Sequence, residues 1–110
     1  MYFCFMNQSG LNKQTLLVLL SENSLAIRKY GVRQLGIFGS FVRNEATENS
    51  DIDFFVDFFP DKKNFDNFME LAFLLQNITG RKIEIITPQS LSKYFGNTIL
   101  KEVEYVSLAA

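Results

Sequence analysis

The chain has 110 residues, 47% of them hydrophobic, so it is long enough to fold around a core of its own and is not expected to be disordered. Its formal net charge of −1, without an obviously basic segment, argues against general binding to nucleic-acid phosphates. It contains no histidine and one cysteine, Cys4, which excludes a catalytic histidine, a Ser-His-Asp triad, a histidine-ligated zinc and an internal disulfide.

The beginning of the sequence gives no sign of a targeting segment. Residues 1–5 are apolar, but the run is too short for a signal peptide and lacks a basic start. The longest aliphatic run, residues 16–20, cannot cross a bilayer. We therefore expect a cytoplasmic protein without a membrane partner, in which residues 1–110 form a single domain. Translation from Met6 instead of Met1 would leave residues 1–5 as a frayed extension.

Hydrophobic spacing and turn residues predict alternating helices and strands. The expected helices cover residues 11–29, 91–101 and a segment capped by Asn64 that ends before Gly80; the expected strands cover residues 33–38, 51–59 and 82–87. Residues 40–45 fit one or two helical turns, residues 46–50 a polar loop, and residues 103–108 either a strand or a helix. This order predicts an α/β (α+β) fold in which helices cover a small sheet.

Two helices carry apolar residues at helical spacing, and we expect these stripes to face the core. The first helix has Leu16, Leu17, Leu20 and Ile27, and the second has Phe65, Phe68, Met69, Ala72 and Phe73. The chain contains twelve phenylalanines, and any that remain exposed would mark a surface for a partner.

The most informative pattern is Gly39-Ser40 followed, after ten residues, by Asp51-Ile52-Asp53. Residues two apart in a strand project from the same face, so Asp51 and Asp53 would lie side by side. Two such carboxylates can hold divalent cations, and a Gly-Ser turn that opens a helix can bind phosphate oxygens. Without histidine, the metal ligands must be oxygens, which favours Mg²⁺ or Mn²⁺. The pattern therefore predicts metal-assisted chemistry on a nucleoside triphosphate.

Three segments together closely resemble the minimal nucleotidyltransferase (MNT) family of the DNA polymerase beta superfamily. They are GVRQLGIFGSFVR at residues 31–43, SDID at residues 50–53 and RKIEIITP at residues 81–88. The similarity runs from about residue 6 to residue 106 and includes ILKE at residues 99–102.

The resemblance implies a polymerase-beta-like fold, with a small mixed sheet flanked by helices, and three carboxylates that bind two Mg²⁺ ions. Many such proteins are antitoxins encoded beside a helical HEPN-domain toxin. Some of them transfer AMP from ATP to a tyrosine of that toxin. The implied partner of this chain is therefore a HEPN-type toxin in a hetero-oligomer, and the implied substrate is ATP.

Carried over to this sequence, the metal ligands would be Asp51 and Asp53, with Glu84 as the third carboxylate and as a base for the attacking hydroxyl. Glu84 lies on the opposite strand parity to Ile83 and Ile85, which directs it away from the core. The family more often has Asp at this point, so the geometry of metal coordination can differ. The alternative for all three is a solvated acidic face.

The triphosphate would bind to the turn formed by Gly39 and Ser40. Gly39 lets the backbone approach a phosphate closely, and Ser40 offers its hydroxyl and its N–H. Arg43 lies about one helical turn later and can neutralise triphosphate charge, or it can pair with Glu45 or Glu48 instead. Asn44 stands where the family commonly has Gly.

These observations predict a Mg²⁺-dependent nucleotidyltransferase that transfers AMP from ATP to a protein hydroxyl of a partner toxin. Two alternatives remain open. In the first, the chain is a non-catalytic antitoxin that blocks its partner by occlusion. In the second, it is an enzyme that transfers a nucleotide to a small molecule or RNA.

Overall fold

The computed structural model of the chain describes residues 11–47, 49–93 and 96–108. The expected extension at residues 1–5, the alternative start at Met6, and Glu48 as a partner of Arg43 all lie outside these residues. No helix among the described residues is long and apolar enough to cross a membrane.

The helix expected at residues 11–29 is divided into two helices. Helix α2 spans Lys13–Glu22 and helix α3 spans Ser24–Lys29. They separate at Asn23, whose side-chain amide donates to the Leu19 carbonyl at 2.8 Å and so ends the first helix. Two aliphatic residues of the predicted stripe on α2, Leu16 and Leu20, are fully buried, as expected.

Four strands form a single mixed sheet in the order β3-β2-β1-β4. Their bounds are Val32–Phe38 for β1, Ile52–Phe58 for β2, Ile83–Ile86 for β3 and Glu104–Tyr105 for β4. Strand β1 is antiparallel to both β2 and β4, whereas β2 and β3 run parallel. Residues 103–108, which fitted a strand or a helix, therefore contribute the edge strand β4. The mixed sheet confirms the predicted fold class.

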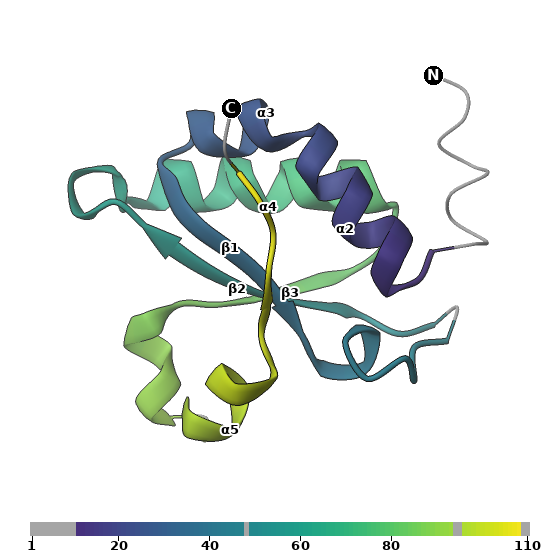
Figure 1. Cartoon of the computed structure of the whole chain (residues 1–110). Helices are drawn as coiled ribbons and strands as arrows, with labels where there is room; N and C mark the ends of the chain where they lie inside the picture. Colours follow the sequence, from purple (N-terminus) through teal and green to yellow (C-terminus); the bar gives the residue numbers. More distant parts are fainter. Residues whose placement is uncertain (1–10, 48, 94–95, 109–110) are drawn as a thin grey trace.

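The two faces of the sheet are covered differently. Helices α2, α3 and α4 (Phe65–Thr79) lie on one face, and α5 (Gly96–Glu102) lies on the other, next to the turn of 3-10 helix at Pro88–Lys93 (Figure 1). The residues of β2 alternate as predicted, so that Ile52, Phe54 and Val56 are fully buried against the three helices. The acidic residues of β2 consequently project from the face that carries α5.

The predicted core face of α4 is wrong for Phe65 and Phe73, whereas Phe68 packs against the core as predicted. Phe65 and Phe73 are 74% and 53% exposed, whereas Leu71 and Leu75 are fully buried. Phe68 is half-buried and packs against Phe58, with 6.4 Å between the ring centroids. Helical spacing allowed two overlapping stripes on this helix, and the aliphatic one faces the sheet.

Candidate active site

The Gly39-Ser40 turn lies directly after β1, where residues 39–41 form a turn of 3-10 helix instead of the longer helical segment expected. Gly39 has φ +80°, and a Cβ at this position would overlap the carboxylate of Asp53. Glycine is therefore required here because Asp53 approaches the turn, in addition to the predicted approach of a phosphate. Asn44 ends the turn with φ +60°, a conformation that Asn tolerates better than most residues.

The three predicted carboxylates lie close to one another around the strand pair β2 and β3. Asp53 and Glu84 are register partners across this parallel pair, and Asp51 immediately precedes β2. Asp53 is half-buried, while Asp51 and Glu84 are exposed. Burial, followed by the negative charges of Glu84 and Asp51, raises the pKa of Asp53 to about 6.

The chemistry of this cluster suits a hard divalent cation. All of its side-chain donors are carboxylate oxygens, which Mg²⁺ and Mn²⁺ prefer. Within the described part of the chain, no three acidic or cysteine side chains already converge to enclose an ion. The carboxylates thus form an open group of like charges, whose mutual repulsion a cation would relieve.

The raised pKa of Asp53 predicts how the stability of the metal-free protein depends on pH. A carboxyl that binds its proton more tightly when folded stabilises the protein below its unfolded pKa of about 3.9, and this contribution is lost as the pH rises through about 6. After a discount for partial exposure, the expected loss is about 1–2 kcal/mol of unfolding free energy.

Urea denaturation in EDTA at pH 5 and pH 7.5 measures about half of this loss, because the rest occurs below pH 5. Asp53→Asn removes the titrating group, so the difference between the two pH values should shrink relative to the wild-type protein. Asp57→Asn, on the same face of β2, is the matched control and should retain the difference. The same pH dependence in wild type and Asp53→Asn would contradict the assignment.

Arg43 contacts two carboxylates. Its Nε donates to Glu45 at 2.9 Å, as one of the sequence-based alternatives anticipated, and its Nη1 donates to Glu102 at 2.8 Å. The hydrogen bonds to Glu45 and Glu102 raise the pKa of Arg43 above its ordinary value, so the guanidinium stays charged. Arg43 therefore lies beside the turn with its charge intact but already paired.

Glu102 was not predicted from the sequence. Its carboxylate accepts a hydrogen bond from the Gly39 N–H at 2.6 Å as well as from Arg43. Burial alone would raise the pKa of Glu102, but these hydrogen bonds outweigh it and lower the pKa. Glu102 ends the segment ILKE that resembles the family, and this resemblance was the one available signal, because no local pattern indicates a contact with a residue 63 positions away.

Arg81 connects the loop before Asp51 with the Gly39-Ser40 turn. Its Nη1 donates to the carbonyls of Thr47 and Ser50, at 2.8 Å and 3.3 Å, in the loop that leads to Asp51. Its guanidinium also lies 5.3 Å from the ring centroid of Phe41, which directly follows Ser40. A single side chain thus holds the loop before Asp51 against the Gly39-Ser40 turn.

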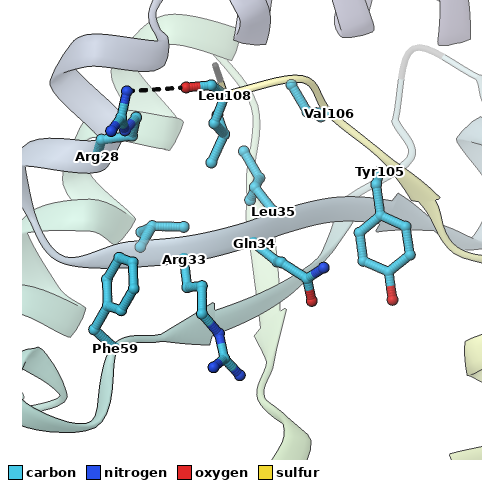
Figure 2. Close-up of a pocket in the computed structure, with 9 residues that line it drawn as sticks. Arg28, Arg33, Gln34, Leu35, Phe59, Tyr105, Val106 and Leu108 are labelled. Atoms are coloured by element: carbon cyan, nitrogen blue, oxygen red, sulfur yellow. Dashed lines mark hydrogen bonds between the residues drawn. The ribbon is translucent and has the colours of Figure 1, made fainter. Parts of the chain in front are cut away.

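Two hollows differ in their relation to the carboxylates. One of about 420 Å³ borders the cluster and is lined by Asn49, Ser50, Asp51, Gly80, Arg81 and Lys82. Another, of about 500 Å³, lies along β1 beside the C-terminal segment, where Arg28 donates to the Leu108 carbonyl (Figure 2). None of the described residues that line this larger hollow is acidic, so they offer no carboxylate to a metal, and the hollow is separate from the candidate site.

Comparison with known sequences identifies the family. A sequence model of the nucleotidyltransferase domain matches residues 21–106. The chain belongs to this family. It is also similar to the protein adenylyltransferase MntA of Thermococcus cleftensis, with 40% identity over 89 residues that cover 81% of this chain and 89% of the relative.

Solved structures of the family share the fold. One provisionally described as a minimal nucleotidyltransferase superposes with a TM-score of 0.73 at 26% identity, covering 87% of this chain and 97% of that chain. Another contains an AMPylated HEPN toxin of Shewanella oneidensis in complex with an MNT antitoxin. It gives a TM-score of 0.52 at 20% identity and covers 93% of this chain and 72% of that chain. The resemblance to minimal nucleotidyltransferases is thereby confirmed.

Proposed function

We propose that this nucleotidyltransferase transfers AMP from ATP to a hydroxyl of a HEPN-type partner toxin, most simply a tyrosine hydroxyl, and that it thereby acts as an antitoxin. The observation that carries the proposal is the position of Asp53, which lies against the Gly39 turn and beside Glu84. The name of the Thermococcus relative supports AMP transfer to protein, and the Shewanella complex supports a HEPN partner.

In this proposal, Asp51, Asp53 and Glu84 hold Mg²⁺, with two ions expected and Mn²⁺ as a substitute. The bound metal would neutralise phosphate charge and favour displacement at the α-phosphorus. The hydroxyl and the N–H of Ser40 and the Arg43 guanidinium bind the triphosphate, and the N–H of Gly39, in the same turn, adds a further donor. These groups come from the turn after β1 and the residues that follow it, and Gly39 itself lies against the Asp53 carboxylate.

The transfer forms one bond and breaks one. The acceptor hydroxyl oxygen bonds to the α-phosphorus of ATP, and the bond between this phosphorus and the leaving pyrophosphate breaks. Glu84 accepts the proton of the hydroxyl, because it is exposed and lies beside Asp53. Asp51 is exposed as well, so a side chain presented by a second protein can reach the cluster from outside.

A second function is favoured by two observations. Glu102 already engages the Gly39 N–H and Arg43, and the third carboxylate is the longer Glu in place of Asp. Both features suit an antitoxin that neutralises its partner by occlusion, with an idle catalytic site. The two functions differ in stoichiometry, since a catalyst modifies many partner molecules and a plug blocks one.

Mass spectrometry distinguishes the two functions. The partner toxin, a HEPN-type protein, is incubated with this protein at about one tenth of its concentration, with ATP and Mg²⁺. We expect most of the toxin to gain the mass of AMP, and peptide mapping identifies the acceptor residue. Neutralisation that requires equal amounts, leaves the toxin mass unchanged and survives Asp53→Ala would instead establish occlusion.

A further inference from the structure

The last residue of α5 reaches into the proposed triphosphate site. One oxygen of Glu102 accepts from the Gly39 N–H at 2.6 Å, and the other accepts from Arg43 Nη1 at 2.8 Å. The Glu102 side chain is only 23% exposed, so the contact lies within the fold. A single carboxylate therefore engages two of the groups that we propose bind the triphosphate, the Gly39 N–H and the Arg43 guanidinium.

These two donors cannot serve Glu102 and a nucleotide at once. The Gly39 N–H has one hydrogen, which forms one strong bond, and the two oxygens of Glu102 bridge the backbone and the guanidinium as two phosphate oxygens would. A triphosphate in the same place would also meet the negative charge of Glu102, and like charges at hydrogen-bonding distance repel. Binding of the phosphate thus requires that the carboxylate leave.

We propose that Glu102 sets the nucleotide affinity of the site, because its carboxylate occupies the Gly39 N–H and Arg43 and a nucleotide phosphate must displace it. This role rests on the proposed function, since it assumes that the turn binds a triphosphate. Glu102 adds its charge to the acidic cluster, because it lies near enough to Asp53 to disfavour the ionised form of that carboxyl. When nucleotide and metal bind and displace the Glu102 carboxylate, its repulsion with Asp53 is relieved.

A purely structural role for Glu102 makes the opposite prediction. If the carboxylate only fixed the turn in a binding-competent shape, its loss would weaken nucleotide binding. If it competes with phosphate, its loss strengthens binding. The direction of the change in affinity therefore separates the two roles.

The test is calorimetric titration of ATP with Mg²⁺ into the full-length wild-type protein and Glu102→Gln. Gln keeps the shape of the side chain and can still accept from the Gly39 N–H, but it removes the charge that holds Arg43. We expect the Kd for ATP to fall about tenfold, equivalent to about 1.4 kcal/mol. Inorganic tripolyphosphate should show the same gain, because the competition involves phosphate and not the base.

Glu104→Gln is the matched control. Glu104 lies two residues further along, and its carboxylate pairs with Lys13 at 2.7 Å instead of with the turn. Its substitution should change the Kd less than about twofold, a change below about 0.4 kcal/mol. Thermal denaturation of all variants verifies that each remains folded.

The outcomes separate the inference from the proposed function. If the wild-type protein binds ATP and Glu102→Gln binds it equally or more weakly, the inference is overturned while the proposed function stands. If neither protein binds ATP or tripolyphosphate, both are overturned. Tighter binding by Glu102→Gln alone, with Glu104→Gln unchanged, supports the inference.

Discussion

Substitution of Asp51 and Asp53 together by Asn is expected to abolish metal-dependent ATP binding and to lower AMP transfer by at least about 100-fold, or about 2.7 kcal/mol of transition-state stabilisation. Asn keeps the size of each side chain but removes the charge that attracts a divalent cation. The fold should persist, because Asp53 is only half-buried and its ionised form is already disfavoured by burial and by its acidic neighbours.

Calorimetric titration of ATP with and without Mg²⁺ measures the first effect, and labelling of the partner toxin measures the second. Asp57→Asn is the control, because Asp57 shares the face of β2 but pairs with Arg33. Its loss should cost no more than a surface ion pair, up to about 1 kcal/mol, and should leave metal-dependent binding in place. Equal ATP binding by the double variant and the wild type would exclude Asp51 and Asp53 as metal ligands.

Glu84→Gln is expected to reduce AMP transfer by about 10²–10⁴-fold, the range typical for loss of a group that accepts a proton in the reaction. Thermal stability should change little, because Glu84 is exposed and no hydrogen bond fixes its position among the described contacts. Glu84→Asp keeps the charge and restores the shorter side chain that is commoner in the family, so it should retain transfer or raise it.

Initial rates at saturating ATP compare the three proteins. Asp61→Asn, at an exposed acidic residue in the turn after β2, controls for the general loss of one negative charge. If Glu84→Gln transferred AMP at the wild-type rate, only Asp51 and Asp53 would keep a catalytic role. The same loss in Asp61→Asn would mean that net charge, and not position, controls the rate.

Much of the site could be predicted because it depends on short-range rules. Alternation along β2 predicted Asp53 on one face and Ile52 and Phe54 on the other. In the structure, Ile52 and Phe54 are fully buried and Asp53 is half-buried. The parity of Glu84 followed from the same rule, although its pairing with Asp53 required the register of a parallel strand, which sequence does not specify. The expectation that the three carboxylates lie close together thus rested on the alternation of side chains along strands and on the family resemblance together.

Other features were out of reach for physical reasons. The break at Asn23 depends on a side-chain hydrogen bond that competes with the helix, and the pattern of apolar residues continues across it. On α4, the choice between two stripes was decided by packing on the sheet, which local spacing does not contain. Glu102 meets Gly39 only because β4 brings the end of α5 back beside β1.

The order of the strands makes some parts of the site more resistant to local unfolding than others. Asp53 belongs to β2, which is paired on both sides, so its backbone amides should exchange with deuterium only when the whole sheet opens. Glu102 adjoins β4, a two-residue edge strand whose register partners on β1 are Gly36 and Ile37, and the Val106 N–H that follows it donates to the Leu35 carbonyl at 2.8 Å. Brief separation of this edge would release Glu102 while Asp53, on the central strand β2, stays in place. A nucleotide would therefore enter where the β4 edge separates and Glu102 moves away, and it would bind beside Asp53, which keeps its position.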